Sequence, residues 1–187
     1  MPDIYIIAGC NGAGKTTAAY NLLPEVLKTV EFVNADEIAR GLSPFNPSGV
    51  AFQAGRIMLG RLEQLIEGSQ NFSFETTLSG MAYINLIKKA KEKGYGVTFF
   101  FVYLNSVNLA KERVAIRVSK GGHTIPEDVI ERRYYKGLRN FALYAAEADD
   151  WYIYDNSGDS YELVAKSIGG EEKVINFDVF KIIQANE

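Results

Sequence analysis

The sequence predicts an α/β fold in which helices flank a five-stranded parallel sheet. Apolar, β-rich runs alternate along the chain with amphipathic helical segments, a pattern that produces parallel strands. The run at residues 96–104 is almost continuously apolar, as expected of a strand that is covered on both faces. With 187 residues, of which 47% are hydrophobic, the chain suits a single domain over residues 1–187.

Residues 9–16 contain a phosphate-binding motif. They read Gly-Cys-Asn-Gly-Ala-Gly-Lys-Thr, which matches the spacing of a glycine, four free positions and then Gly-Lys-Thr. An apolar run at residues 4–8 precedes the motif, and a helix-compatible segment at 15–23 follows it. In this context a tight loop presents backbone N–H groups to phosphate oxygens at the start of a helix. The sequence therefore predicts a P-loop NTPase fold.

The motif indicates binding of ATP or GTP together with Mg²⁺. Lys15 is expected to reach the β- and γ-phosphates, and the Thr16 hydroxyl is expected to bind the metal ion. The residues expected to bind the nucleotide are Gly9, Asn11, Gly12, Ala13, Gly14, Lys15, Thr16 and Thr17. Cys10 occupies a free position as a small space-filling residue. Because a helix N-terminus lowers the pKa of a nearby thiol, its position also predicts a modification that bound nucleotide blocks.

The hydrophobic pattern places the other elements. After the first helix, strands are expected at residues 31–35, 71–77, 96–104 and 151–155, and helices at 46–67, 83–93, 106–120 and 124–145. The core stripe expected in the helix at 46–67 is Val50, Ala54, Ile57, Leu62 and Leu65. Residues 124–127 read as a capping box. Residues 161–178 read as a hairpin around Gly169 and Gly170, followed by a last helix from 179.

Carboxylates follow the carboxyl ends of two predicted strands, which is where ligands bind in open α/β sheets. Asp36 is the candidate base for an acceptor hydroxyl in phosphoryl transfer, and the alternative is that it caps the next helix. Glu75 and Thr77 are expected to bind the acceptor. Their alternatives are an exposed strand end and an ordinary cap.

Basic residues gather on one face of the helix at 106–120. Arg113, Arg117 and Lys120 recur there at helical spacing. The stripe resembles a mobile lid that brings guanidinium groups to the transferred phosphate, because arginine pairs with two oxygens at once. Arg113 and Arg117 are the catalytic candidates, and Lys120 fits a solvated face. Arg133 and His123 are weaker candidates, and His123 is expected to order the glycine turn before it.

The overall charge limits the partners. A net charge of −3 gives no general attraction to nucleic acid or to an anionic membrane, so anion binding must come from local basic residues. Arg40 and Arg56 are expected to contact an anionic acceptor or to form surface salt bridges. A single cysteine, no apolar N-terminal segment and no run long enough to span a bilayer together predict a cytoplasmic protein.

Four segments together resemble the zeta toxin family of P-loop kinases. They are GCNGAGKTT at residues 9–17, NADEIAR at 34–40, FETTL at 74–78 and RVAIRVSKGGHTIPEDVIERRY at 113–134. The resemblance covers residues 4–158. It implies a parallel sheet with nucleoside-monophosphate-kinase-like strand order, use of a nucleoside triphosphate with Mg²⁺, and phosphorylation of UDP-N-acetylglucosamine on a sugar hydroxyl. An antitoxin protein would be the partner.

The resemblance also assigns roles to individual residues. It implies that Lys15 and Thr16 hold the donor and the metal, that Asp36 is the base, that Glu75 and Thr77 fix the acceptor, and that Arg117, joined by Arg113, is the lid arginine. The sequence departs from the family pattern at Asn34, where the family often has aspartate, and at Thr76, where it has glycine.

The function expected from the sequence is transfer of a γ-phosphoryl group to a hydroxyl of a small, anionic metabolite, with a nucleotide sugar as the leading acceptor. Two alternatives remain open. One is a nucleoside or antibiotic phosphotransferase on the same scaffold. The other is a nucleotide-dependent switch that binds a protein partner, although the Asn-Lys-x-Asp motif of GTPase switches does not occur in the sequence.

Overall fold

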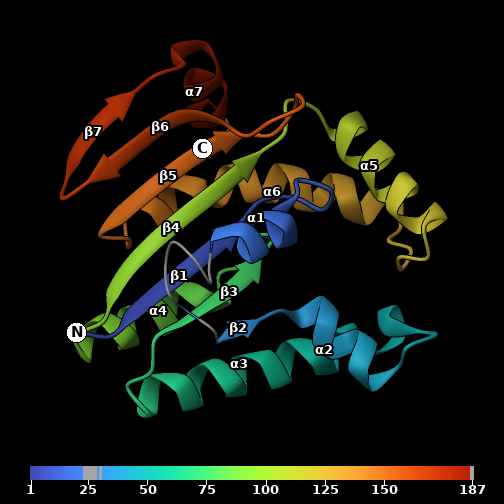
Figure 1. Ribbon diagram of the computed structural model, residues 1–187, viewed down its shortest axis with the longest axis horizontal. Helices are drawn as coiled ribbons and strands as arrows, with labels where there is room; N and C mark the ends of the chain where they lie inside the picture. The colour runs from blue at the N-terminus through green and yellow to red at the C-terminus, as the bar shows by residue number, and fades with distance from the viewer. Residues whose placement is uncertain (23–28, 30, 186–187) are drawn as a thin grey trace.

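The computed structural model describes residues 1–22, 29 and 31–185, which form a seven-stranded sheet with helices on both faces (Figure 1). The strands are β1 Asp3–Ala8, β2 Phe32–Val33, β3 Phe72–Thr76, β4 Gly96–Tyr103, β5 Asp150–Asp155, β6 Glu162–Ile168 and β7 Glu171–Val174. The helices are α1 Lys15–Leu22, α2 Ala35–Leu42, the 3₁₀ helix η1 Pro47–Val50, α3 Ala51–Glu67, α4 Ala82–Glu92, α5 Val107–Ser119, α6 Glu127–Ala145 and α7 Phe177–Gln184.

The strand order is β2-β3-β1-β4-β5-β6-β7. The first five strands in this order are parallel, which confirms the predicted sheet and the order that the family resemblance implies. β6 pairs antiparallel with β5, and β7 with β6, so the predicted hairpin extends the same sheet at one edge. Because five strands are parallel, their carboxyl ends meet at one edge, where the P-loop leaves β1.

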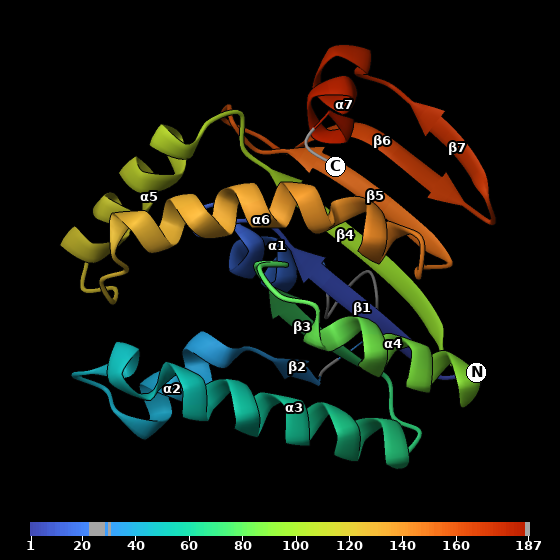
Figure 2. The same ribbon diagram turned by 180° about the vertical axis from the view of Figure 1, so that it is seen from behind.

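The two faces of the sheet are covered unequally. α4 and α6 lie on one face and α1 on the other, as the two opposite views show (Figure 2). The larger core lies under α6, where Phe99 packs against Phe141 and Tyr144 with ring centroids 5.7 and 6.3 Å apart. On the α1 face Ile7, Ala19 and Phe100 form a separate, smaller cluster. Because many side chains of α6 are buried against the sheet, α6 is held firmly where it passes over the site.

Two helix starts differ from the sequence prediction. A 3₁₀ turn precedes α3, so the buried stripe runs through Met58 rather than Ile57, which is exposed. The capping box at 124–127 is wrong as well: α6 begins at Glu127 after Pro126, and no side chain caps it. A proline disfavours helical angles at the residue before it, so the helix begins only after Pro126, two residues beyond Thr124.

The end of the first predicted helix, at residue 23, lies outside the described residues. Among the residues that are described, no helix combines the length and the apolar character that crossing a membrane requires.

Candidate active site

The loop between β1 and α1 has the shape expected of a phosphate cradle. Gly9, Gly12 and Gly14 have φ angles of 143°, 81° and 90°, which L-residues with side chains rarely adopt. A Cβ atom at Gly9 would lie 2.2 Å from the carbonyl oxygen of Val102 in β4. Only glycine therefore lets the loop pass this close to the sheet.

The connection between β5 and β6 supports the cradle from outside. Asn156 Nδ2 donates to the carbonyl of Ala13 at 2.9 Å, and the Tyr161 hydroxyl donates to the carbonyl of Gly14 at 2.8 Å. The sequence pattern gave no role to Tyr161. Both side chains donate hydrogen bonds to carbonyl groups of the loop. These contacts hold the loop in the shape of the cradle without any help from nucleotide.

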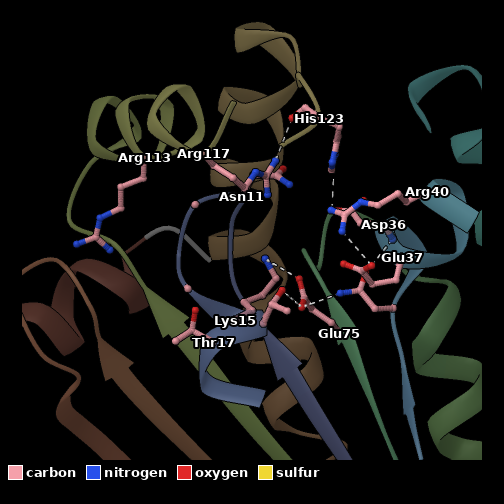
Figure 3. A pocket seen from close by; sticks show the side chains of 14 residues that line it. Asn11, Lys15, Thr17, Asp36, Glu37, Arg40, Glu75, Arg113, Arg117 and His123 are labelled. Atoms are coloured by element: carbon pink, nitrogen blue, oxygen red, sulfur yellow. Dashed lines mark hydrogen bonds and ion pairs between the residues drawn. The ribbon is translucent and has the colours of Figure 1, made fainter. Parts of the chain in front are cut away.

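Glu75 lies at the centre of the polar network (Figure 3). Its Oε1 is 3.4 Å from Lys15 Nζ, and its Oε2 accepts hydrogen bonds from Thr16 Oγ1 at 2.7 Å and from Asn34 Nδ2 at 3.0 Å. Lys15 also donates to the carbonyl of Cys10 at 2.9 Å. The side chains of Lys15 and Glu75 are only 5% and 10% exposed. Glu75 thus contacts the phosphate-binding residues directly, a position that the sequence had not assigned to it.

The same atoms fit a magnesium ion. The Thr16 hydroxyl and a carboxylate oxygen of Glu75, 2.7 Å apart, are both hard oxygen ligands. Mg²⁺ is usually bound by one or two carboxylates plus phosphates and water, rather than by a cage of protein ligands. No group of three or more His, Cys, Asp or Glu side chains suited to a metal occurs in the described part of the chain.

Asp36 lies in the first turn of α2 rather than at the end of a strand. The N-cap of α2 is Asn34, whose Oδ1 accepts the backbone N–H of Asp36 at 2.8 Å. The alternative that Asp36 itself caps the helix is therefore wrong. Its carboxylate is 41% exposed and lines the cavity above the P-loop (Figure 3). It has the freedom that a proton acceptor needs.

Two cavities meet at Asp36. The first, which we call the P-loop cavity, has a volume of about 270 Å³ and is lined by the phosphate cradle, by Arg113, Arg117 and His123, and by α2. The second, which we call the adjoining cavity, has about 250 Å³ and is lined by residues of β3, of the following loop and of α6. The residues that line both cavities are Asn11, Asn34, Asp36 and Glu75.

The predicted lid arginines both line the P-loop cavity. Arg113 donates from Nη1 to the carbonyl of Asn156 at 2.7 Å and reaches two further carbonyls of the β5–β6 connection. Arg117 donates from Nη2 to the carbonyl of His123 at 3.4 Å, and its Nε is buried without a hydrogen-bond partner among the described residues. Arg117 therefore retains a donor for a ligand, whereas Arg113 is engaged with the main chain.

The residues predicted to bind the acceptor are not all brought together. Thr77 lines the adjoining cavity, where its hydroxyl is 3.0 Å from that of Ser79. Arg40 lines the P-loop cavity instead, half-exposed and paired with Glu37 at 3.1 Å. Arg56 is exposed on α3 and lines neither cavity. The helix register turns it away from α2, so we exclude it from the site.

Arg133 has a larger place in the site than the sequence suggested. Its Nη1 donates to Asn11 Oδ1 at 3.2 Å, which joins α6 to the P-loop, and it lines the adjoining cavity. Burial lowers the pKa of Arg133, and the carboxylate of Asp36 opposes that shift. The feature of the sequence that could have indicated this role is the position of Arg133 next to the buried stripe of α6.

Cys10 fills space in the core, as the sequence predicted, but its thiol is not activated. Its side chain is only 6% exposed and belongs to the main core. Burial raises the pKa of the thiol to about 11, against the smaller opposing effects of Lys15 and Arg113. The prediction of a lowered pKa is wrong, because desolvation outweighs the nearby positive charge. Cys10 is a packing residue.

The fold and the site define a nucleotide-dependent phosphotransferase of the P-loop kinase class. The sequence profile of the Zeta toxin family matches residues 1–163. The chain therefore belongs to the zeta toxin family, which confirms the resemblance seen in the sequence.

Comparisons with individual proteins agree with this assignment. The chain is 35% identical to an uncharacterised protein of Haemophilus influenzae over 127 residues, which are 67% of this chain and 88% of that protein. The crystal structure of AvrRxo1-ORF1:-ORF2 with ATP superposes on 100% of this chain with a TM-score of 0.80 and 20% identity, and the chain spans 64% of that protein. A structure from the PezAT toxin-antitoxin system of Streptococcus pneumoniae gives a TM-score of 0.63 and 15% identity over 99% of this chain and 85% of that chain. At these identities the structural likeness shows the fold alone.

Proposed function

We propose that this protein transfers the γ-phosphoryl group of ATP or GTP to a hydroxyl group of a small, anionic metabolite. UDP-N-acetylglucosamine or a related nucleotide sugar is the first candidate acceptor. The proposal rests on one observation: the P-loop cavity and the adjoining cavity share the carboxylates of Asp36 and Glu75. Phosphoryl transfer needs donor and acceptor held in line on either side of such a boundary, within reach of one base.

The donor would occupy the P-loop cavity. The cradle's N–H groups and Lys15 would bind its phosphates, and Lys15 would exchange part of its contact with Glu75 for the β- and γ-phosphates. Thr16 and Glu75 would hold Mg²⁺, which neutralises charge that develops on the phosphates. The free Nε of Arg117 would add a donor to the transferred group. Each of these contacts stabilises negative charge in the transition state.

Asp36 would act as the base. The acceptor oxygen forms a bond to the γ-phosphorus while the bond from that phosphorus to the bridging oxygen breaks, and the nucleoside diphosphate leaves. The hydroxyl proton passes to the Asp36 carboxylate, so the atoms and charges balance. The half-exposed carboxylate in the shared lining of the two cavities is suited to this step, because a base must be within hydrogen-bond reach of the proton that it removes.

The adjoining cavity would hold the acceptor. Its lining offers hydroxyl groups from Thr77 and Ser79, together with the guanidinium of Arg133. Within the described residues no carboxylate lies close enough to Arg133 to form an ion pair, so this half-buried cation is available to an acidic group of the acceptor. Hydroxyl-rich and cationic surroundings suit a sugar that carries phosphate.

A transfer assay with a matched pair of variants tests the proposal. Purified protein is incubated with γ-labelled ATP or GTP, Mg²⁺ and either UDP-N-acetylglucosamine or a metabolite extract, and the compound that gains the label is identified. Asp36→Asn should lower the rate of transfer by about 10²- to 10⁴-fold, with nucleotide affinity nearly unchanged, because only the base is lost.

The control is Asp178→Asn. Asp178 lies two residues after Asn176, which caps α7, just as Asp36 lies two residues after Asn34, which caps α2. Its side chain is exposed and it lines neither cavity of the site. It should transfer at the normal rate. Full transfer by Asp36→Asn would refute the assignment of the base, and failure of every acceptor to gain label would favour a nucleotide-dependent switch.

We propose, in addition, that the kinase is toxic and has a neutralising protein partner. This is supported by its family and by two structural neighbours, one a complex of two gene products and one part of a toxin-antitoxin system. Induced expression in bacteria should stop growth for the unaltered protein and for Asp178→Asn, but not for Asp36→Asn. Equal growth of all three cultures would contradict toxicity and leave the transferase proposal to the assay above.

A further inference from the structure

His123 lies between the predicted lid and the turn that holds Asp36. It belongs to the connection between α5 and α6, and its side chain is only 13% exposed. Its Nε2 is 3.9 Å from Asp36 Oδ2 (Figure 3). The ring lines the P-loop cavity and also a third cavity of about 360 Å³, and Asp36 lines both of these. The imidazole thus faces the carboxylate across the site.

The surroundings favour a neutral imidazole. Burial lowers the pKa of His123, and the guanidinium groups of Arg117, Arg40 and Arg133 lower it further, while Asp36 opposes them. These charged groups come from each element around the ring, α2, α5 and α6. A neutral ring has one N–H group, and a lone pair on Nε2 would be repelled by the carboxylate that it faces. The proton therefore belongs on Nε2.

The other ring nitrogen has no partner. Nδ1 of His123 is buried and makes no hydrogen bond with any described residue. An unpaired buried acceptor is unfavourable, so it is retained only where another role of the residue outweighs that cost. The contact between Nε2 and Asp36 is the interaction in this site that would supply such a role.

We propose that His123 is a positioning residue that orients Asp36. A hydrogen bond from Nε2–H to Oδ2 would leave the second oxygen of Asp36 to accept the proton of the acceptor hydroxyl. The separation of 3.9 Å must shorten to about 3 Å for this bond, so the connection between α5 and α6 closes toward α2. The inference rests on the proposed function, in which Asp36 is the base.

The same closure would move Arg117. Arg117 donates to the carbonyl of His123, so the guanidinium and the imidazole travel with one connection. On the far side, the Ser48 hydroxyl lies 3.5 Å from the carbonyl of Thr124, which gives the connection a contact with η1. Orientation of the base and arrival of the arginine at the transferred phosphate are thereby coupled, and neither is complete in a site that lacks donor.

The first test does not need the acceptor. In protein labelled with ¹⁵N at histidine, the ring shifts of the single His123 should report the Nε2–H tautomer when Mg²⁺ and a non-hydrolysable ATP analogue are bound. In protein labelled with ¹³C at the aspartate carboxyls, His123→Ala should move the carboxyl resonance of Asp36 at neutral pH, because the carboxylate loses a hydrogen-bond donor. An Nδ1–H tautomer, or an Asp36 carboxyl resonance that does not move, would overturn the proposal.

The second test separates positioning from folding. His123→Ala should lower kcat by about 10- to 100-fold, the range expected for loss of a hydrogen bond to a charged group, with the KM for nucleotide unchanged. His123→Gln keeps an N–H donor and should recover part of kcat. Lys120→Ala, an exposed change in the same connection, should leave kcat at the normal value.

The outcomes distinguish this inference from the proposed function. An unchanged kcat in His123→Ala, or no recovery in His123→Gln, would contradict the positioning role. If the tautomer and the Asp36 carboxyl resonance behave as expected but no variant transfers phosphate to any acceptor, the contact between the residues stands and the proposed reaction fails.

Discussion

The P-loop cavity and the adjoining cavity lie side by side at Asp36, yet they are built differently. The first includes one continuous loop whose shape depends on glycine at fixed positions. Side chains from β3, α2 and α6 form most of the second. Backbone geometry is set by local sequence, whereas convergent side chains depend on how distant elements pack. The loop is therefore the part of the site that the sequence defines best, and the adjoining cavity is the part that it defines least.

The loop after β3 illustrates how the adjoining cavity is held. Leu78 is fully buried with a φ of 52°, and its carbonyl accepts a hydrogen bond from Asn140 Nδ2 at 2.6 Å. The Tyr144 hydroxyl donates to the carbonyl of Gly80 at 2.7 Å. A Cβ atom at Gly137 would lie 2.9 Å from the carbonyl oxygen of Thr77. α6 thus clamps this loop through three separate residues on one helix.

The largest expected effect comes from breaking the cradle. Gly9→Ala should lower the free energy of unfolding by more than about 3 kcal/mol, because a Cβ 2.2 Å from the Val102 carbonyl and a φ of 143° are both unfavourable. Urea denaturation measures this change. Gly60→Ala, in the middle of α3 with no atom within 4 Å of the added methyl, should instead raise stability by about 0.5–1 kcal/mol. Equal stability of the two variants would show that the loop is not constrained by β4.

A smaller effect should appear in alkaline solution. The folded protein holds the proton of Cys10 up to a pKa of about 11, whereas an exposed thiol loses it near 9.0. The contribution of the protonated Cys10 thiol to the free energy of unfolding is complete below pH 9. It is lost as pH rises through the folded-state pKa, by up to about 1.4 kcal/mol per pH unit.

The measurement is the slope of unfolding free energy against pH. Cys10→Ala should have a shallower slope than the unaltered protein between pH 9 and pH 11. An ionised Cys10 raises the pKa of Tyr103 and of Tyr134, so the difference between the two proteins reports the thiol together with its effect on these tyrosines. Identical slopes would mean that the thiol of the cradle is open to solvent.

The smallest effect is expected from α6. Gly137→Ala should push the Thr77 carbonyl aside and raise the KM for the acceptor about tenfold, equivalent to about 1.4 kcal/mol, with the KM for nucleotide unchanged. Steady-state kinetics with the acceptor that the transfer assay identifies measures both constants, and Gly55→Ala in α3, which has open space around it, is the control. A matching rise in the KM for nucleotide would show that the two cavities are not independent.

The sequence predicts the cradle well because spacing alone defines it. The sequence also predicted that Asp36 lies at the carboxyl edge of the sheet. It did not predict that Asp36 lies in the first turn of α2, since β2 has only two residues and ends before it. The contact of Glu75 with Lys15 depends on the register of β1 against β3, in which Ile7 lies beside Glu75. Tyr161 is 147 positions from Gly14 in the sequence, and no local sequence pattern predicts a hydrogen bond between them.

Charge alone was a weak guide to the acceptor side. Arg56 and Arg133 are both arginines on long helices, and the sequence ranked Arg56 as a binding residue. A rotation of the α3 register by a fraction of a turn decides whether a side chain meets α2 or solvent, and Arg56 meets solvent. Arg133, beside the buried stripe of α6, points to the P-loop instead.

β2 has only Phe32 and Val33, its pairing with β3 is extended by the Glu31 carbonyl, and the proposed base follows Val33 by three residues. Short hydrogen-bonded segments open locally at lower free energy than the rest of a protein, so amide protons of β2 should exchange early. On warming, the turn that bears the base would detach while β1 and β4, paired over most of their length, still hold the nucleotide loop. Catalysis would then fail at a lower temperature than nucleotide binding.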